Sequence, residues 1–109
     1  MSIPSGSERR QSARHLCGAW TSGRVLTTGG DEREVLAVFN LSSGGVRLVL
    51  RNHFDPDTVV SVRLTHSLRD IECEVPLKVV YVEPYPNGHY IVGGSFGRDL
   101  TSTEVQELV

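Results

Sequence analysis

Apolar residues recur at every second position in several short runs of this chain, and this period of two constrains the fold more than any other feature. Alternation places successive side chains on opposite faces of a strand, so each run can bury one face and expose the other. The longest series runs along one predicted strand and consists of Ile71, Cys73, Val75, Leu77, Val79 and Tyr81. The chain is therefore predicted to be mostly β.

Shorter runs with the same pattern end at Gly, Pro, Asn or Asp residues, which are the usual residues of turns. We predict further strands at 15–23, 34–39, 46–51, 59–64 and 90–96, although two glycines weaken the first of them. In the second, Val35, Ala37 and Phe39 are expected to share the buried face. Asn87-Gly88 accepts the positive φ angles of a type I′ turn, so the last two strands should form a hairpin.

Two local signals mark other parts of the chain. Pro76 lacks a backbone N–H and predicts an edge or a bulge within the longest strand. Thr101 and Glu104 have the spacing of a capping box, which predicts a helix of about two turns with Val105 and Leu108 on its apolar side. Together the elements favour a small antiparallel six-stranded β-barrel with a short C-terminal helix, and a β-sandwich stays open as an alternative.

Length and composition indicate one folded domain. A chain of 109 residues can build one core of ordinary size, and 39% apolar with 22% charged residues is normal for a globular protein. Residues 1–7 contain three Ser and one Pro, so we expect a flexible N-terminal arm there and a barrel domain at 8–109. No apolar run approaches the ~18 residues of a membrane span, and we expect a cytoplasmic protein.

The charge and the chemistry-bearing residues narrow the function. A net charge of −2 and a pI near 6.0 argue against a surface that tracks DNA. Cys17 and Cys73 match no disulfide framework or zinc pattern and are expected to be buried thiols. The four His residues are scattered, with no nucleophile or metal spacing, so they are expected at the surface. We expect neither an enzyme nor a cofactor.

A cluster of arginines lies between the expected arm and the first strand. Arg9, Arg10 and Arg14 fall within six residues. Each guanidinium is a planar fork that matches a phosphate, or the O6/N7 edge of guanine, with two parallel hydrogen bonds. A short basic run is more often a solvated arm, so the cluster alone does not define a site.

A second polar segment, Asn40 to Gly45, separates two predicted strands. The Asn40 amide can accept from a guanine N–H, the Ser42 hydroxyl can donate and accept, and Gly45 allows close backbone approach. A simple tight turn would use the same residue types. The segment is therefore a candidate guanine reader, with a plain turn as the alternative.

The two segments together resemble the paired signature of the PilZ domain family: R-x-x-x-R at Arg10 and Arg14, then N-x-S-x-x-G at Asn40, Ser42 and Gly45. The resemblance extends over about residues 8–109 and includes a G-x-x-F segment that begins at Gly93. It implies a barrel that binds the bacterial second messenger cyclic di-GMP, with Gly93 also in the site. Arginine immediately before the motif, here Arg9, implies an intercalated pair of ligands.

The leading hypothesis is a receptor or adaptor that binds cyclic di-GMP and alters its interaction with a partner protein. By the resemblance, that partner belongs to motility, secretion or polysaccharide-synthesis machinery. The alternative is a PilZ-like interaction module that binds no nucleotide. A phosphodiesterase is a distant third, because no cluster of metal-binding residues is visible.

Overall fold

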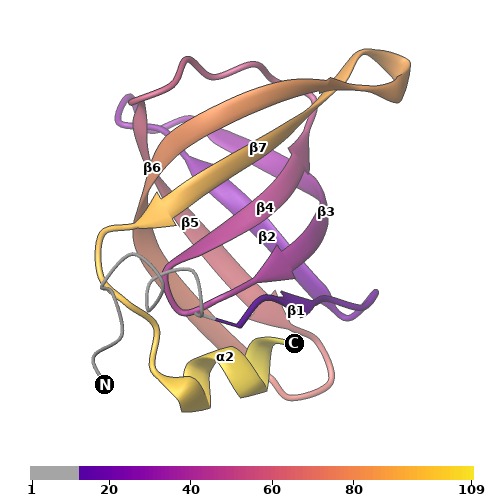
Figure 1. Ribbon diagram of the computed structural model, residues 1–109, viewed down its shortest axis with the longest axis vertical. Helices are drawn as coiled ribbons and strands as arrows, with labels where there is room; N and C mark the ends of the chain where they lie inside the picture. Colours follow the sequence, from indigo (N-terminus) through magenta and orange to yellow (C-terminus); the bar gives the residue numbers. More distant parts are fainter. Residues whose placement is uncertain (1–12) are drawn as a thin grey trace, which may run out of the picture.

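The computed structural model describes residues 13–109, which form a closed antiparallel barrel with one additional strand and one helix (Figure 1). Six strands pair in the order β3-β2-β5-β6-β7-β4, and β4 returns to β3 to close the barrel. The barrel strands are β2 (Thr21–Leu26), β3 (Glu32–Leu41), β4 (Gly45–Leu50), β5 (Val59–His66), β6 (Ile71–Tyr85) and β7 (His89–Phe96). This confirms the predicted six-stranded barrel over the sandwich. The arm expected at residues 1–7 lies outside the described residues.

The first predicted strand, at 15–23, is two strands in the structure. The short strand β1 (His15–Leu16) pairs with the end of β3, outside the barrel, and β2 begins at Thr21. A turn separates them, in which the Thr21 N–H donates to the Gly18 carbonyl at 3.3 Å. Of the two glycines that weakened the prediction, Gly18 lies in this turn between the strands, whereas Gly23 lies inside β2 and is buried.

The strand β3 departs from simple alternation. Its pairing with β4 shifts between Val35 and Ala37 and again between Val38 and Asn40. Each shift adds one residue and turns the following side chains to the other face. The buried residues are consequently Val35, Val38 and Leu41. The prediction that Ala37 and Phe39 would share a buried face with Val35 was wrong for this reason.

The strand β6 alternates as predicted from Ile71 to Val79, and then a bulge intervenes. Its pairing with β7 shifts between Val79 and Tyr81, which leaves Tyr81 partly exposed on the outer face. The predicted placement of Tyr81 on the buried face was wrong for this reason. Pro76 lies before the bulge, and its carbonyl accepts from Gly97 N–H at 2.8 Å, on the side away from β5. The β5–β6 ladder therefore loses no hydrogen bond to this proline.

The hairpin between β6 and β7 extends beyond the barrel at the end away from the helix (Figure 1). Its loop is the single turn η1 (Pro86–Gly88), and φ is 67° at Asn87 and 77° at Gly88. Positive φ at both residues agrees with the expectation for Asn-Gly, and the pairing of the last two strands is confirmed. The loop contains three residues between the paired Tyr85 and His89.

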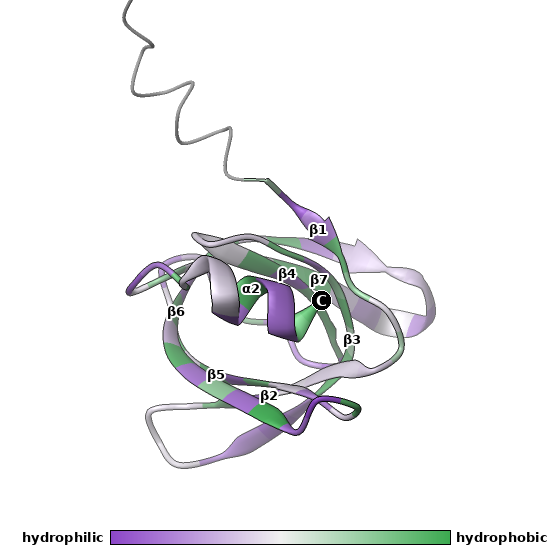
Figure 2. Cartoon of the chain, turned by 90° about the horizontal axis from the view of Figure 1, so that it is seen from below, coloured by the Kyte–Doolittle hydropathy of each residue, from purple (hydrophilic) through white to green (hydrophobic). Residues whose placement is uncertain are grey.

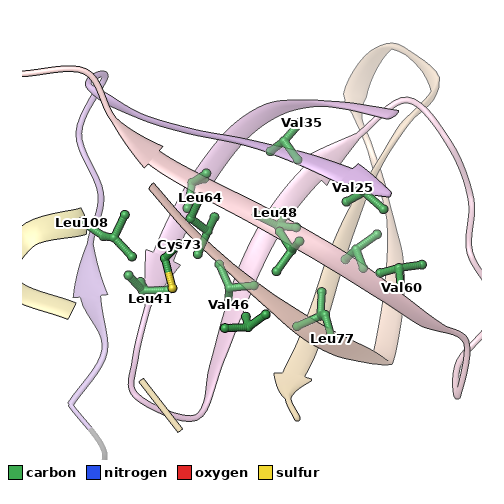
Figure 3. Close-up of a cluster of buried hydrophobic side chains, with 14 of the residues drawn as sticks. Val25, Val35, Leu41, Val46, Leu48, Val60, Leu64, Cys73, Leu77 and Leu108 are labelled. Atoms are coloured by element: carbon green, nitrogen blue, oxygen red, sulfur yellow. The ribbon is translucent and has the colours of Figure 1, made fainter. Parts of the chain in front are cut away.

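Aliphatic side chains from all six barrel strands fill the barrel (Figure 3). The helix α2 (Ser102–Leu108) lies across one end (Figures 1 and 2) and adds Val105 and Leu108 to this core. Thr101 caps it with both hydrogen bonds of a capping box, as predicted. The last turn of α2 is also held to the barrel: Arg69, which lies between β5 and β6, donates to the Gln106 carbonyl at 2.6 Å. The helix is thus an integral cover of the barrel.

Burial of the cysteines and histidines differs in part from expectation. Cys73 is buried, whereas Cys17 is only half-buried. His66 is 5% exposed, so the expectation of surface histidines was wrong at this position. It faces inward because residues from Val60 to His66 alternate regularly along β5 and even-numbered positions point into the barrel. No helix among the described residues is long and apolar enough to cross a membrane.

Candidate ligand-binding site

The end of β7 lies beside the beginning of β4 (Figure 1). Residues of both segments line an open pocket. Its volume is about 750 Å³, within the range of small-molecule sites. Five segments supply its lining, namely the residue before β1, the β3–β4 turn, the β6 bulge, the end of β7 and the linker to α2. The lining residues are Arg14, Ser42, Gly44, Gly45, Val80, Tyr81, Gly93, Gly94, Ser95, Phe96 and Asp99.

Arg14 and Asn40 are joined directly. The Arg14 Nη1 donates to the Asn40 Oδ1 at 2.8 Å, although 26 residues separate them in the chain. The strand β1 explains the approach, because Leu16 pairs with Asn40 and His15 with Leu41. The Arg14 side chain is exposed and lines the pocket, while Asn40 is half-buried and is not among the lining residues. The structure therefore brings the last arginine of the first motif to the first residue of the second.

Ser42 closes the turn between β3 and β4 and also lines the pocket. Its N–H donates to the Gly45 carbonyl at 2.9 Å, and its Oγ accepts from the Gly44 N–H at 3.3 Å. The side chain is 4% exposed. The predicted segment Asn40 to Gly45 is thus divided between β3, a tight turn and β4, with Ser42 holding the turn in shape.

Glycines form the floor of the pocket because neighbouring groups approach too closely for a side chain. A Cβ on Gly45 would lie 2.4 Å from the Gly94 carbonyl oxygen of the adjacent strand. A Cβ on Gly93 would lie 2.1 Å from the Tyr81 ring. Both positions were expected in the site, and the structure gives each a packing reason for being glycine.

Sequence reasoning missed Val80, Tyr81, Phe96 and Asp99 as pocket residues. The bulge in β6 turns the Tyr81 ring outward over Gly93, and alternation had assigned Tyr81 to the core. Asp99 follows the last strand in an irregular linker, where no periodic pattern places a side chain. The Val80–Tyr81 pair in an otherwise alternating strand was the one visible sign of the bulge.

Two of the predicted site residues, Arg9 and Arg10, lie outside the described residues. Among the described residues that line the pocket, Arg14 is the single cation and Asp99 is the single anion. The described lining offers one guanidinium fork, one carboxylate, the hydroxyls of two serines and one tyrosine, two aromatic rings and a glycine backbone that a flat ligand can approach.

An ion pair fixes the linker that carries Asp99. The Arg98 Nη1 and Nη2 donate to the two Glu104 carboxylate oxygens, each at 3.0 Å, and the Thr101 N–H donates to Oε1 at 2.9 Å. The hydrogen bonds from Arg98, and to a smaller extent the one from Thr101, lower the pKa of Glu104 to about 2. Burial raises the pKa of the neighbouring Cys73 thiol, whose Sγ contacts Glu104 at 3.4 Å. Among residues 13–109, no group of three or more His, Cys, Asp or Glu could hold a metal ion.

A small barrel with an open pocket lined by an arginine and a Ser-Gly turn, in which the arginine donates to the Asn at the end of the preceding strand, defines a ligand-binding module of the β class. A comparison with models of known protein families agrees with a binding module and identifies the family. The model of the PilZ domain matches residues 8–109, and this chain belongs to that family. PilZ domains are regulatory binding modules of the cyclic di-GMP receptor class. No curated protein sequence matches the chain.

Solved structures with this fold include two PilZ proteins. MrkH of K. pneumonia in complex with c-di-GMP superimposes with a TM-score of 0.68 at 16% identity, over 92% of this chain and 49% of that one. The Bacillus subtilis inhibitor of motility MotI/DgrA gives 0.64 at 17% identity, over 92% of this chain and 47% of that one. The chain spans about half the length of each, and at such identity the likeness establishes the fold.

Proposed function

We propose that this chain is a receptor that binds cyclic di-GMP and changes its interaction with a protein partner on binding. The observation that carries the proposal is the hydrogen bond between Arg14 and Asn40 at the pocket. It joins the two motifs that, in the family, grip the phosphates and read a guanine. Separate surface roles for the two segments would not require them to meet.

The chemistry of the pocket supports this ligand. The Arg14 fork matches a phosphate, and the Tyr81 ring offers a face or edge to a purine. The glycine floor allows a flat base to approach the backbone. MrkH, which shares the fold, is known in complex with c-di-GMP. By the residue match, Arg9 and Arg10 would add further cations from the segment before Arg14.

A receptor of this kind signals when the ligand changes a surface that another protein reads. The β3–β4 turn, part of the pocket, is bonded to the linker that leads to α2, because the Ser43 carbonyl accepts from the Leu100 N–H at 2.8 Å. Ligand contacts on this turn would therefore bear on the helix end of the barrel. We place the partner in motility, secretion or polysaccharide-synthesis machinery, and the receptor in the cytoplasm.

Calorimetric titration with cyclic di-GMP tests the proposal. The wild-type chain should bind without consuming the ligand, and Arg10→Ala or Arg14→Ala should weaken binding by about 1.5–3 kcal/mol, which is the worth of a charge-assisted contact. Arg24→Ala is the matched control, because Arg24 is exposed on β2 outside the pocket. Absence of heat with the wild-type chain would favour the interaction module, and loss of ligand would indicate an enzyme.

A further inference from the structure

Asp99 is the one carboxylate among the described residues that line the pocket. It lies between β7 and α2, and its side chain is exposed. Within residues 13–109, its carboxylate makes neither an ion pair nor a hydrogen bond, and the cation of the pocket, Arg14, donates to Asn40 instead. An unpaired carboxylate repels a phosphate, so its presence in a phosphate pocket calls for a donor on the ligand.

The residues on both sides of Asp99 are fixed. Arg98 forms the paired hydrogen bonds to Glu104 at 3.0 Å, and its Nη1 also donates to the Asp99 carbonyl at 3.1 Å. Leu100 is 3% exposed in the core, and its N–H donates to the Ser43 carbonyl. The backbone of Asp99 is thus held in place while its side chain is left open to the pocket. A fixed acceptor of this kind loses little entropy when a ligand arrives.

Asn40 is a weaker candidate for the same acceptor, because it is not among the residues that line the pocket. Its Oδ1 already accepts from Arg14, and the side chain is a neutral amide. The Ser42 hydroxyl is engaged within its own turn. Of the pocket groups described, the Asp99 carboxylate is therefore the strongest open acceptor.

Guanine presents two adjacent donors on one edge, the N1–H and the exocyclic N2–H. A carboxylate accepts both with its two oxygens, and the charge strengthens each bond. Adenine presents an acceptor at N1 and a hydrogen at C2 on the same edge, so it would place a lone pair against the carboxylate. We propose that Asp99 reads the N1–H/N2–H edge of a guanine in the bound ligand and sets the preference for guanine over adenine. This inference rests on the proposed function.

Titration of three proteins with cyclic di-GMP and with cyclic di-AMP tests the assignment. The proteins are the wild-type chain, Asp99→Asn, and Asp31→Asn as the matched control. The Asp31→Asn substitution removes the same negative charge from the β2–β3 turn, which lies outside the pocket. Circular dichroism verifies that each variant is folded.

Asp99→Asn should weaken cyclic di-GMP binding by about 10- to 100-fold, because one acceptor becomes a neutral donor. Its affinity for cyclic di-AMP should be unchanged or higher, since an amide N–H can meet adenine N1. The guanine preference should therefore fall in Asp99→Asn and persist in Asp31→Asn. An unchanged preference in Asp99→Asn, with Arg14→Ala still impaired, would overturn this inference alone. Failure of the wild-type chain to bind either ligand would overturn the proposed function as well.

Discussion

The Arg14 guanidinium donates to the Asn40 carboxamide at 2.8 Å, and the two-residue strand β1 is the element that makes this contact possible. Leu16 pairs with Asn40, so Arg14 emerges at the edge of β3 directly beside the motif that follows it in the sequence by 26 residues. A ladder of two residues is marginal by itself. The side-chain hydrogen bond therefore helps to hold the chain before β1 against the pocket.

Asn40→Asp should tighten ligand binding. An aspartate has the shape of asparagine but makes a charge-assisted hydrogen bond, which is stronger by about 1 kcal/mol, or roughly fivefold in affinity. It would fix Arg14 more firmly in the orientation that faces the pocket. Calorimetry with cyclic di-GMP measures the change, and Asn52→Asp, outside the pocket, serves as the control. Equal affinity for Asn40→Asp and the wild-type chain would show that Asn40 does not govern Arg14 in the complex.

The barrel and its helix were predictable from local patterns. Alternation identified β4, β5 and the regular part of β6, and the capping box located α2 at the correct residue. The positions of the bulges were not predictable: Pro76 suggested an edge or a bulge in the longest strand, but the register shift lies between Val79 and Tyr81. An added residue is a response to barrel closure and curvature, which has no fixed sequence signal. The shifts in β3 and β6 consequently reversed the assigned faces of Phe39 and Tyr81.

The candidate site was predictable only where motifs name its residues. Arg14, Ser42, Gly45 and Gly93 line one pocket, and Asn40 contacts the first of them. Tyr81 depends on the bulge, and Asp99 depends on a linker whose path is set by tertiary contacts. Such positions follow from packing between distant segments, which a single sequence does not display.

Gly45→Ala should destabilise the fold, because the new Cβ would lie 2.4 Å from the Gly94 carbonyl oxygen. Relief requires β4 and β7 to separate, and overpacking of this kind costs about 1–3 kcal/mol. Gly44→Ala is the neighbouring control, since nothing lies within 4 Å of its Cβ position, and it should change stability by less than about 0.5 kcal/mol. Urea denaturation measures both. Similar midpoints for the two variants would refute a packing role for Gly45.

Glu104→Gln should reduce stability at neutral pH by about 1 kcal/mol, since it removes an ion pair with Arg98 and weakens the cap of α2. The pKa of Glu104 is lowered from 4.5 to about 2 in the folded chain. Its stabilising contribution is therefore complete above pH 4.5 and is lost as the pH falls toward 2, where the folded state also takes up the proton.

The free energy of unfolding, measured by urea denaturation at several pH values between 7 and about 2, reports the contribution of Glu104 to stability. The wild-type chain should lose more stability than Glu104→Gln across the acid range. Glu107→Gln, an exposed change on the same helix, should behave as the wild-type chain does. Parallel pH profiles for the wild-type chain and Glu104→Gln would show that the ion pair does not stabilise α2.

The number of ligands that the chain binds is expected to depend on Arg9. Two cyclic dinucleotides carry four phosphate charges between them, and Arg14 is the single cation among the described residues lining the pocket. Further guanidinium groups are therefore needed to neutralise and stack on a second ligand. Arg9 and Arg10, which lie outside the described residues, are the nearest candidates in the sequence.

Calorimetry at saturating cyclic di-GMP should give about two ligands per wild-type chain and about one for Arg9→Ala, because loss of the extra fork removes the contact that retains the outer ligand. Arg9→Lys keeps the charge but not the planar fork, so it should give weakened uptake of the second ligand.

Arg24→Ala is the control and should retain both ligands. Sedimentation of the complex distinguishes a ligand pair on one chain from a ligand shared by two chains. Binding should also weaken as salt is raised, since the contacts are largely phosphate to arginine. One ligand per wild-type chain under saturation would exclude this role for Arg9, and the assignment of Arg14 and Asn40 would stand unaffected.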